Sequence, residues 1–242
     1  MKQGLLADVH QHVLWGLDDG SQTEEEMHAL LEQDAAEGVG LVFATCHGDP
    51  SGEMPDPKLY HKRLKKAKHY CKDQGLDIRV LPGCEIFYRD SAIEHLAAGN
   101  LIPLGNSRFV LVEFELETSL KNICNAADRL YRAGYAPIVA HVERYTDLML
   151  HPKQAIKMRE EYGLTYQMNC HTVTHPRGLR MQYFVHRMLK EQAIDVIASD
   201  AHNVTARPVR MQEAKENLLK LTDEEYTNRL LTFGWKLAGE KK

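Results

Sequence analysis

The sequence predicts a one-domain α/β protein whose seven parallel strands form a closed or nearly closed barrel. Short apolar segments alternate seven times with amphipathic helical segments, as in folds built from βα repeats. No linker or shift in composition divides the 242 residues, so we treat residues 1–242 as a single domain. No glycine-rich phosphate loop follows the first predicted strand, which disfavours a dinucleotide-binding fold.

The first half of the chain carries clear start and stop signals. A first strand runs to about His12, and Ser21 and Thr23 each precede a Glu by three residues, which predicts a capped helix that stops at Gly38. Pro57 is placed to begin the next helix, which ends at Gly75. The further strands of this half are expected at 39–45, 78–85 and 109–113, and its other helices at 91–98 and 120–133.

The second half repeats the same alternation. Strands are expected at 137–141, 164–169 and 194–199, and helices at 152–162, 183–192, 210–221 and 223–237. The tail from Gly239 to Lys242 is expected to fray.

Composition excludes several classes of protein. The net charge of -4 disfavours a nucleic-acid partner, and the basic segment 62–68 is interpreted as the solvated face of a helix. No apolar run approaches the roughly 20 residues of a membrane helix, so no membrane insertion is expected. Five scattered cysteines without CxxC spacing and the lack of a signal-peptide pattern predict a cytoplasmic location.

Side chains able to bind metals stand at, or just after, the ends of six predicted strands. His10 and His12 are separated by one residue, so both side chains point to the same side of a strand. In a barrel the carboxyl ends of all strands meet at one rim, which would gather these residues. The candidate metal ligands are His10, His12, Asp19, His47, Glu85, Glu113, His141, Asp200 and His202.

This set of residues predicts a cluster of two or three divalent ions. Five histidines and four carboxylates exceed the needs of one tetrahedral zinc, and carboxylates packed together without cations would stay partly protonated. Mixed imidazole and carboxylate ligands suit Mn, Fe or Zn. Such a cluster makes hydroxide available near neutral pH and polarises a phosphoryl group.

Other residues near the predicted rim are candidates for binding the substrate or supporting the ligands. Arg144 and Arg207 follow two of the strand-end histidines, and their guanidinium groups match phosphate oxygens. His171 and His175 follow the sixth strand and could line the pocket. Asp8 is interpreted as a residue that orients a neighbouring histidine.

The segments that carry these residues resemble the PHP (polymerase and histidinol phosphatase) superfamily. The resemblance is strongest to its bacterial tyrosine-protein phosphatase branch, which is found with capsule and exopolysaccharide genes of Gram-positive bacteria. The matching segments are Asp8–Gly20, Ala44–His47, Leu81–Glu85, Val112–Glu113, Ala140–Tyr145 and Ala198–Pro208.

This resemblance implies a distorted (β/α)7 TIM-like barrel with three metal ions, manganese above all, at the carboxyl ends of the strands. It implies that Arg144 and Arg207 bind the phosphate, and in our mechanistic hypothesis His202 or a metal ion assists the departing phenolate. It also implies the ligands of each ion. These are His10, His12, Glu85 and Asp200 for the first, Glu85, Glu113 and His141 for the second, and Asp19, His47 and His202 for the third.

The expected activity is metal-dependent hydrolysis of phosphotyrosine by a metal-bound hydroxide, on a tyrosine kinase that controls capsule or exopolysaccharide synthesis. A histidinol-phosphatase-like or other small-molecule phosphoesterase is the alternative, and a regulatory metal-binding protein is a third reading. Whether the chain forms homo-oligomers stays open. Four departures from the family pattern bear on the substrate. They are Cys46, the segment 48–51, the acidic segment 113–117 and the segment His171–His175.

A cysteine-dependent tyrosine phosphatase is rejected. That chemistry needs a cysteine thiolate with Arg six positions later in a phosphate-binding loop. The residues six positions after the five cysteines are Gly52, Asp77, Asp90, Leu130 and Pro176.

Overall fold

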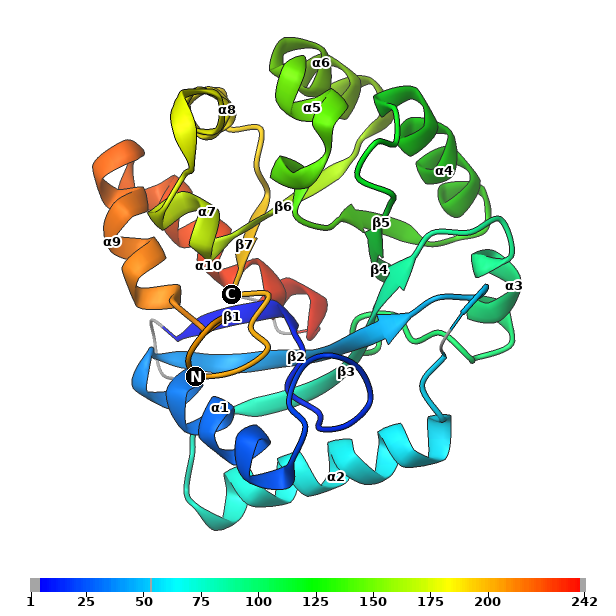
Figure 1. Ribbon diagram of the computed structural model, residues 1–242, viewed down its shortest axis with the longest axis vertical. Coiled ribbons are helices and arrows are strands. Elements are labelled where there is room, and N and C mark those ends of the chain that lie inside the picture. Colours follow the sequence, from blue (N-terminus) through cyan, green and yellow to red (C-terminus); the bar gives the residue numbers. More distant parts are fainter. Residues whose placement is uncertain (1–4, 53, 240–242) are drawn as a thin grey trace.

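Seven parallel strands form a nearly closed barrel in the computed structural model, which describes residues 5–52 and 54–239. The strands are hydrogen-bonded in sequence order, from β1 to β7, and helices surround them (Figure 1). The strands are β1 (Leu6–Gln11), β2 (Val39–Gly48), β3 (Arg79–Phe87), β4 (Phe109–Glu113), β5 (Ala136–Val139), β6 (Thr165–Asn169) and β7 (Val196–Ala198).

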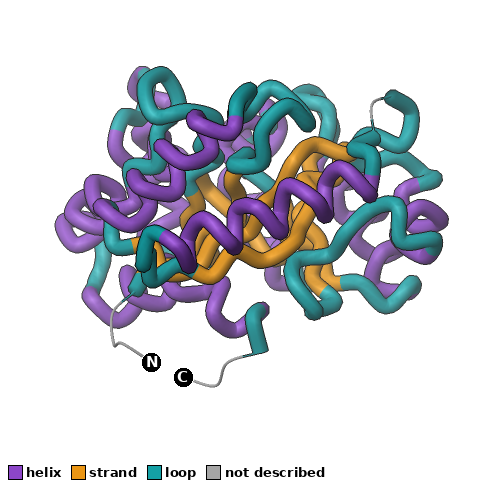
Figure 2. Tube along the Cα trace, turned by 90° about the horizontal axis from the view of Figure 1, so that it is seen from below, coloured by secondary structure: helices purple, strands orange, loops and turns teal. Residues whose placement is uncertain are grey.

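Helices lie on both sides of the strands when the molecule is turned by 90° (Figure 2). They are α1 (Glu24–Ala36), α2 (Pro57–Asp73), α3 (Ala92–Ala97), α4 (Leu120–Arg132), the 3-10 turn η1 (Val142–Arg144), α5 (Thr146–Leu150), α6 (Pro152–Tyr162), α7 (Cys170–Thr174), α8 (Gly178–Lys190), α9 (Met211–Leu221) and α10 (Glu224–Leu237). The predicted capping residue Thr23 accepts a hydrogen bond from the Glu26 amide at the start of α1.

The barrel closes through the segment that follows β7. The Asp200 amide donates to the carbonyl oxygen of His10 at 2.8 Å, and the His12 amide donates to that of Ala201 at 2.9 Å. The last strand is thereby joined to the first at their carboxyl ends. The closure brings the histidines of β1 beside the residues that follow β7.

Apolar side chains fill the barrel interior, and helix α10 covers its amino-terminal end. The interior cluster joins side chains from six strands and the connecting segments to Leu237 of α10. A larger apolar cluster lies between the strands and the surrounding helices. These two layers leave the carboxyl ends of the strands for polar side chains.

A β-bulge in β1 decides which way its histidines face. Asp8 pairs with Val42 and Gln11 with Ala44, so β1 contains one more residue than β2 over this stretch. Ala7 and Val9 face the barrel interior. The additional residue shifts the alternation, so that His10 and His12 also turn inward, above the apolar layer.

Several helices and strands begin or end at residues other than the predicted ones. Strand β2 extends to Gly48 and therefore contains His47. Strand β5 ends at Val139, so that His141 lies outside it. Helix α8 begins at Gly178, five residues before the predicted start, and the short helices α5 and α7 were not predicted. Of the tail predicted to fray, residues 240–242 lie outside the described residues.

Among the residues that the structure describes, no helix has the length and apolar character required to cross a membrane.

Candidate metal centre

All nine predicted ligands meet at the carboxyl ends of the strands. Three groups of their ligand atoms each lie within 4.8 Å of one another. The groups are His10, His12, Glu85 and Asp200; His47, Glu85 and Glu113; and His12, Asp19, His47 and His202. His141 joins the cluster through Glu85 and Glu113.

The first group is fully buried and built around one carboxylate of β3. Nε2 of His10 lies 3.1 Å from Glu85 Oε2 and 3.3 Å from Asp200 Oδ1. Nε2 of His12 lies 3.2 Å from the same Glu85 oxygen and 3.2 Å from His10 Nε2. Two ligands of one zinc ion, each about 2.1 Å from it, stand about 3.0–3.4 Å apart. The observed separations therefore suit side chains that share an ion.

The second group lies on the other side of Glu85. His141 Nε2 is 2.8 Å from Glu85 Oε1 and 3.3 Å from Glu113 Oε1. His47 Nδ1 is 3.1 Å from Glu85 Oε2 and 4.0 Å from Glu113 Oε2. Glu85 thus presents Oε1 to His141 and Oε2 to His10, His12 and His47, so its two oxygens could bridge neighbouring ions.

The third group forms the solvent-facing side of the cluster. Asp19 Oδ1 lies 3.3 Å from His47 Nε2 and 3.2 Å from His202 Nε2. The side chain of Asp19 is 65% exposed and that of His47 is 40% exposed, whereas His202 is 2% exposed. This side of the cluster is therefore open to solvent.

Hydrogen bonds behind the histidines fix the direction of their lone pairs. His12 Nδ1 lies 2.7 Å from Asp18 Oδ2, and His10 Nδ1 lies 3.2 Å from Gln167 Oε1. His202 Nδ1 lies 3.0 Å from the Asp200 carbonyl oxygen. An acceptor at Nδ1 places the proton there, so in each ring the Nε2 lone pair faces the cluster.

Sequence reasoning missed Asp18 and Gln167 as partners of the ligands. Asp18 directly precedes Asp19, and its position beside a candidate ligand was the available signal. Gln167 lies inside β6 and gave no signal in the sequence, because its contact with His10 joins residues 157 positions apart.

The predicted role of Asp8 is wrong in its detail. Asp8 Oδ1 accepts a hydrogen bond from the backbone amide of His10 at 3.2 Å, and Asp8 makes no hydrogen bond with the His10 ring. It also accepts from the backbone amide of Ser199 at 3.0 Å. Asp8 therefore joins the ends of β1 and β7, and the ring of His10 is oriented by Gln167 instead.

Unpartnered atoms in the cluster indicate that these residues fit metal ions. Glu85 Oε2, His141 Nδ1 and His202 Nε2 are buried and make no hydrogen bond. Buried polar atoms normally have partners, and Glu85 Oε2 and His202 Nε2 face other ligand atoms across distances that suit a shared ion. The donor set, imidazole with carboxylate, is the one that Mn, Fe and Zn use.

Burial and neighbouring charges shift the pKa values of several side chains in the cluster. Burial alone would raise the pKa of Glu85, but the charge of His10 and the close approach of three histidine rings hold that pKa well below its ordinary value. Burial would lower the pKa of His141, but Glu113 and Glu85 raise it to about 10. Burial, together with the charge of His12, lowers the pKa of His202 to about 4.

Backbone strain coincides with this cluster. Only four non-glycine residues among those described have positive φ, and two of them are His141 (φ 31°) and Asp200 (φ 53°). Such conformations cost about 1–3 kcal/mol each and persist where the surrounding structure enforces them. At the end of β5 the left-handed residue turns His141 toward Glu85.

The two predicted phosphate-binding arginines stand at the rim. Arg144 Nη1 lies 3.7 Å from Glu113 Oε1, and Arg207 Nη2 lies 2.8 Å from Asp200 Oδ2. Their side chains are 44% and 42% exposed. Both line one cavity of about 460 Å³ that also contains Asp200, His171 and His175.

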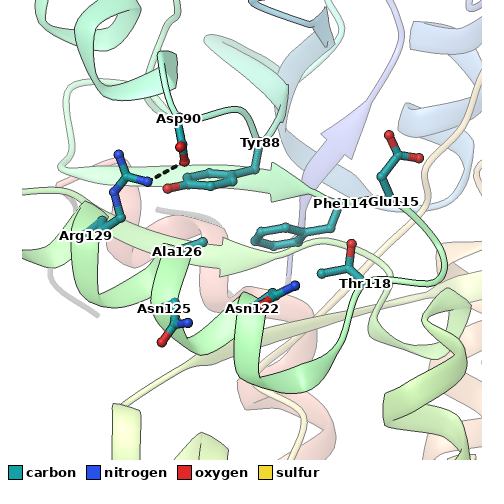
Figure 3. Close-up of a pocket in the computed structure, with 9 residues that line it drawn as sticks. All are labelled: Tyr88, Asp90, Phe114, Glu115, Thr118, Asn122, Asn125, Ala126 and Arg129. Atoms are coloured by element: carbon teal, nitrogen blue, oxygen red, sulfur yellow. Dashed lines mark hydrogen bonds and ion pairs between the residues drawn. The ribbon is translucent and has the colours of Figure 1, made fainter.

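A second, smaller cavity of about 280 Å³ follows β3 and β4 (Figure 3). Tyr88 and Phe114 form its aromatic side, with ring centroids 5.5 Å apart. Asn122 and Asn125 of α4 line the cavity as well, and Arg129 is paired with Asp90.

The barrel and the histidine–carboxylate cluster together define an α/β-barrel protein with side chains fit for a metal site. Residues 6–234 match the model of the CpsB/CapC family, described as capsular polysaccharide synthesis. The chain belongs to the CpsB/CapC family.

Named relatives cover nearly the whole chain. The tyrosine-protein phosphatase CpsB of Streptococcus pneumoniae is 30% identical over 225 residues, which cover 89% of this chain and 90% of the relative. The tyrosine-protein phosphatase YwqE of Bacillus subtilis is 24% identical, with 93% and 87% covered.

Solved structures confirm the fold. A structure from work on YwqE and CpsB, described as unique metal-dependent tyrosine phosphatases, superposes with a TM-score of 0.88 at 24% identity and covers 98% of this chain and 96% of the other. A histidinol phosphate phosphatase of Lactococcus lactis, solved with zinc, L-histidinol and phosphate, gives 0.58 at 12% identity, with 89% and 93% covered.

Proposed function

We propose that this protein is a metal-dependent protein tyrosine phosphatase, a phosphoric monoester hydrolase. One observation carries the proposal: buried, unpartnered ligand atoms converge beside two partly exposed arginines on a single rim. Membership of a family whose curated relatives are named tyrosine-protein phosphatases supports the choice of phosphotyrosine.

The metal site would contain three divalent ions, manganese by preference, with iron or zinc as alternatives. His10, His12, Glu85 and Asp200 would hold the first ion, and the observed separations of their ligand atoms support this grouping. The second ion would be held by Glu85, Glu113 and His141, and the third by Asp19, His47 and His202. His47 also faces Glu85, so it lies between the second and third groups.

Ions bound there would act as Lewis acids on the phosphate and make hydroxide available near neutral pH. The chain itself binds and orients the substrate. Arg144 and Arg207 bind phosphate oxygens through their guanidinium groups. Asn169 donates to Asp200 Oδ2 at 2.8 Å and holds that carboxylate in place. The phenolate is a good leaving group and needs little protonation. His202, whose buried Nε2 makes no hydrogen bond, would therefore contribute a lone pair rather than a proton.

The substrate would be a phosphotyrosyl protein, and we propose a tyrosine kinase that controls capsule or exopolysaccharide synthesis. The description of the family, capsular polysaccharide synthesis, supports this setting. A cytoplasmic location follows from the same proposal, because kinases draw ATP from the cytoplasm.

The test combines metal analysis with a panel of phosphotyrosyl peptide, histidinol phosphate and a dinucleotide. We expect hydrolysis of the peptide above all, complete loss with EDTA, and no loss with iodoacetamide, since all five cysteines are buried. Arg144→Gln should lower kcat/KM about 100-fold or more with metal content unchanged, whereas the exposed Arg132→Gln should match the wild type.

Three outcomes would contradict the proposal. Activity that survives EDTA and is lost with iodoacetamide would exclude the metal mechanism. Preference for histidinol phosphate would favour the small-molecule phosphatase. A metal-loaded protein that is inactive on every phosphoester would indicate a metal-binding protein without this activity.

A further inference from the structure

The cavity of about 460 Å³ beside the metal centre carries more positive charge than one phosphate requires. Four arginines line it, two of which, Arg177 and Arg210, have no role in the proposed reaction. Arg177 occupies the N-cap position of α8, where its side chain makes no capping hydrogen bond. It is exposed and makes no ion pair with any described residue. It therefore presents a free guanidinium group to a ligand in the cavity.

Arg210 is held at the cavity wall by its backbone. It is one of the four described non-glycine residues with positive φ, at 53°, immediately before α9. Glu213 pairs with it at 2.8 Å and fixes the direction of its side chain. Backbone strain clusters at functional sites. The strain at Arg210, whose side chain is anchored beside the cavity, therefore marks this wall as a candidate binding site.

His171 and His175 lie in the same wall and report on its charge. Their rings are stacked, with centroids 5.4 Å apart. Burial lowers the pKa of His171, and the positive charges of His175, Arg210 and Arg177 lower it further. Arg210, from the segment before α9, thus acts on the same imidazole as His175 and Arg177, which lie together between α7 and α8.

Negative charge in the cavity is already engaged. Its wall contains two acidic residues. Asp200 is paired with Arg207 at 2.8 Å, and Glu143 is 1% exposed and accepts a hydrogen bond from the Asn169 amide. Neither offers a partner to Arg177.

The lining of this cavity is polar and charged rather than aromatic. It contains no Phe, Tyr or Trp, and its apolar members are Met181, Ala206 and Pro208. The cavity of Figure 3 is the opposite case, because it has an aromatic side and its arginine is neutralised by Asp90. Of the two, only the larger cavity offers an arginine without an ion pair among the described residues, Arg177.

We propose that Arg177 and Arg210, with His171 and His175, form a subsite for a second anionic group of the substrate, next to the phosphate that is removed. The subsite rests on the proposed phosphatase function and specifies its substrate: a phosphotyrosyl peptide with an anionic side chain close to the phosphotyrosine. The anion is a carboxylate or a second phosphoryl group, since guanidinium groups bind both.

The test uses the metal-loaded full chain and three peptides that differ only at the residues flanking phosphotyrosine, which are Gln, Glu or phosphoserine. We expect KM about fivefold lower for an anionic peptide than for the Gln peptide, as one exposed ion pair supplies. The better of the Glu and phosphoserine peptides identifies the anion. Fluorescence anisotropy with the same peptides carrying a non-hydrolysable phosphonate measures binding without turnover.

Arg177→Gln should reduce the KM ratio between Gln and anionic peptides to about one, and Arg177→Lys should keep part of it. Arg180→Gln is the matched control, because Arg180 is exposed on the same helix and does not line the cavity. It should keep the full ratio.

Equal KM values for all three peptides in the wild type would overturn the subsite and leave the phosphatase function intact. An unchanged ratio in Arg177→Gln would overturn it as well. Failure to hydrolyse any of the peptides would refute the proposed function itself, and the subsite with it.

Discussion

At the scale of single residues, a buried pair of side chains beside the candidate metal centre has an incomplete hydrogen-bond pattern. Gln11 Nε2 donates to Asp34 Oδ1 at 2.9 Å, while Gln11 Oε1 and Asp34 Oδ2 are buried without partners. Burial and the nearby charge of Asp8 raise the pKa of Asp34 well above its ordinary value. A proton on Asp34 Oδ2, or an amide in its place, could donate to Gln11.

Asp34→Asn should therefore stabilise the protein, and more so as pH rises. In the wild type the unfolded chain releases the Asp34 proton near pH 4, whereas the folded protein retains it to higher pH. Folding stability from this group is complete below pH 4 and decreases by up to about 1.4 kcal/mol per pH unit until the raised pKa is passed. Asn does not titrate, so its advantage in urea unfolding should grow from pH 5 to pH 8.

The exposed Glu216→Gln on α9 is the control for this experiment. It changes one acid to its amide where no burial is involved, and its difference from the wild type should stay within about 0.5 kcal/mol. An Asp34→Asn difference that is independent of pH would show that the buried carboxyl is ionised throughout.

At the scale of elements, helix α10 seals the barrel by close contact at one glycine. A Cβ atom on Gly234 would lie 2.9 Å from Ala7 Cβ and 3.0 Å from Val9 Cγ1 of β1, and 3.3 Å from Phe43 Cε2 of β2. The helix thus approaches the strands more closely than any side chain there would allow, and this contact supports β1 from below.

Gly234→Ala should destabilise the protein although alanine favours helices. The gain in helix propensity is about 1 kcal/mol, and overpacking costs about 1–3 kcal/mol, so we expect a net loss of about 1 kcal/mol in chemical denaturation. Asn228→Ala, on the exposed face of the same helix, should be neutral or slightly stabilising. Equal stability of the Gly234 variant and the wild type would mean that α10 can move away from the barrel.

At the scale of the whole molecule, the barrel concentrates charge that ions would balance. Four strands and three loops contribute carboxylates and imidazoles to one largely buried cluster. Divalent ions would bind the folded state but find no such site in the unfolded chain. Metal binding should therefore be coupled to global stability.

Free Mn²⁺ at about 100 times its Kd should add about 2.7 kcal/mol to the free energy of unfolding. For a chain of this size that raises Tm by about 5–10 °C, measured by calorimetry on metal-free and metal-loaded protein. His69→Gln, an exposed histidine outside the cluster, should keep the whole shift, and Glu85→Gln should lose most of it. The same Tm with and without metal, tested with zinc and iron as well, would contradict the metal site.

The sequence by itself determined the βα order and the candidate ligands. Apolar segments bounded by helix caps and glycines define the strands, and Glu85, Glu113 and Asp200 stand at or just after strand ends in the sequence. These features are local. The pattern of apolar residues along a strand shows which residue ends it, and no contact with a distant segment is needed.

Tertiary structure decided how those residues face one another. The bulge in β1 turns His10 and His12 inward, and the left-handed conformation of His141 turns it toward Glu85. Both are enforced by packing and by closure of the barrel. The contact of Gln167 with His10 and the shared wall of Arg177 and Arg210 join residues far apart in the chain. No local pattern encodes such contacts, because they exist only once the strands are paired and the barrel is closed.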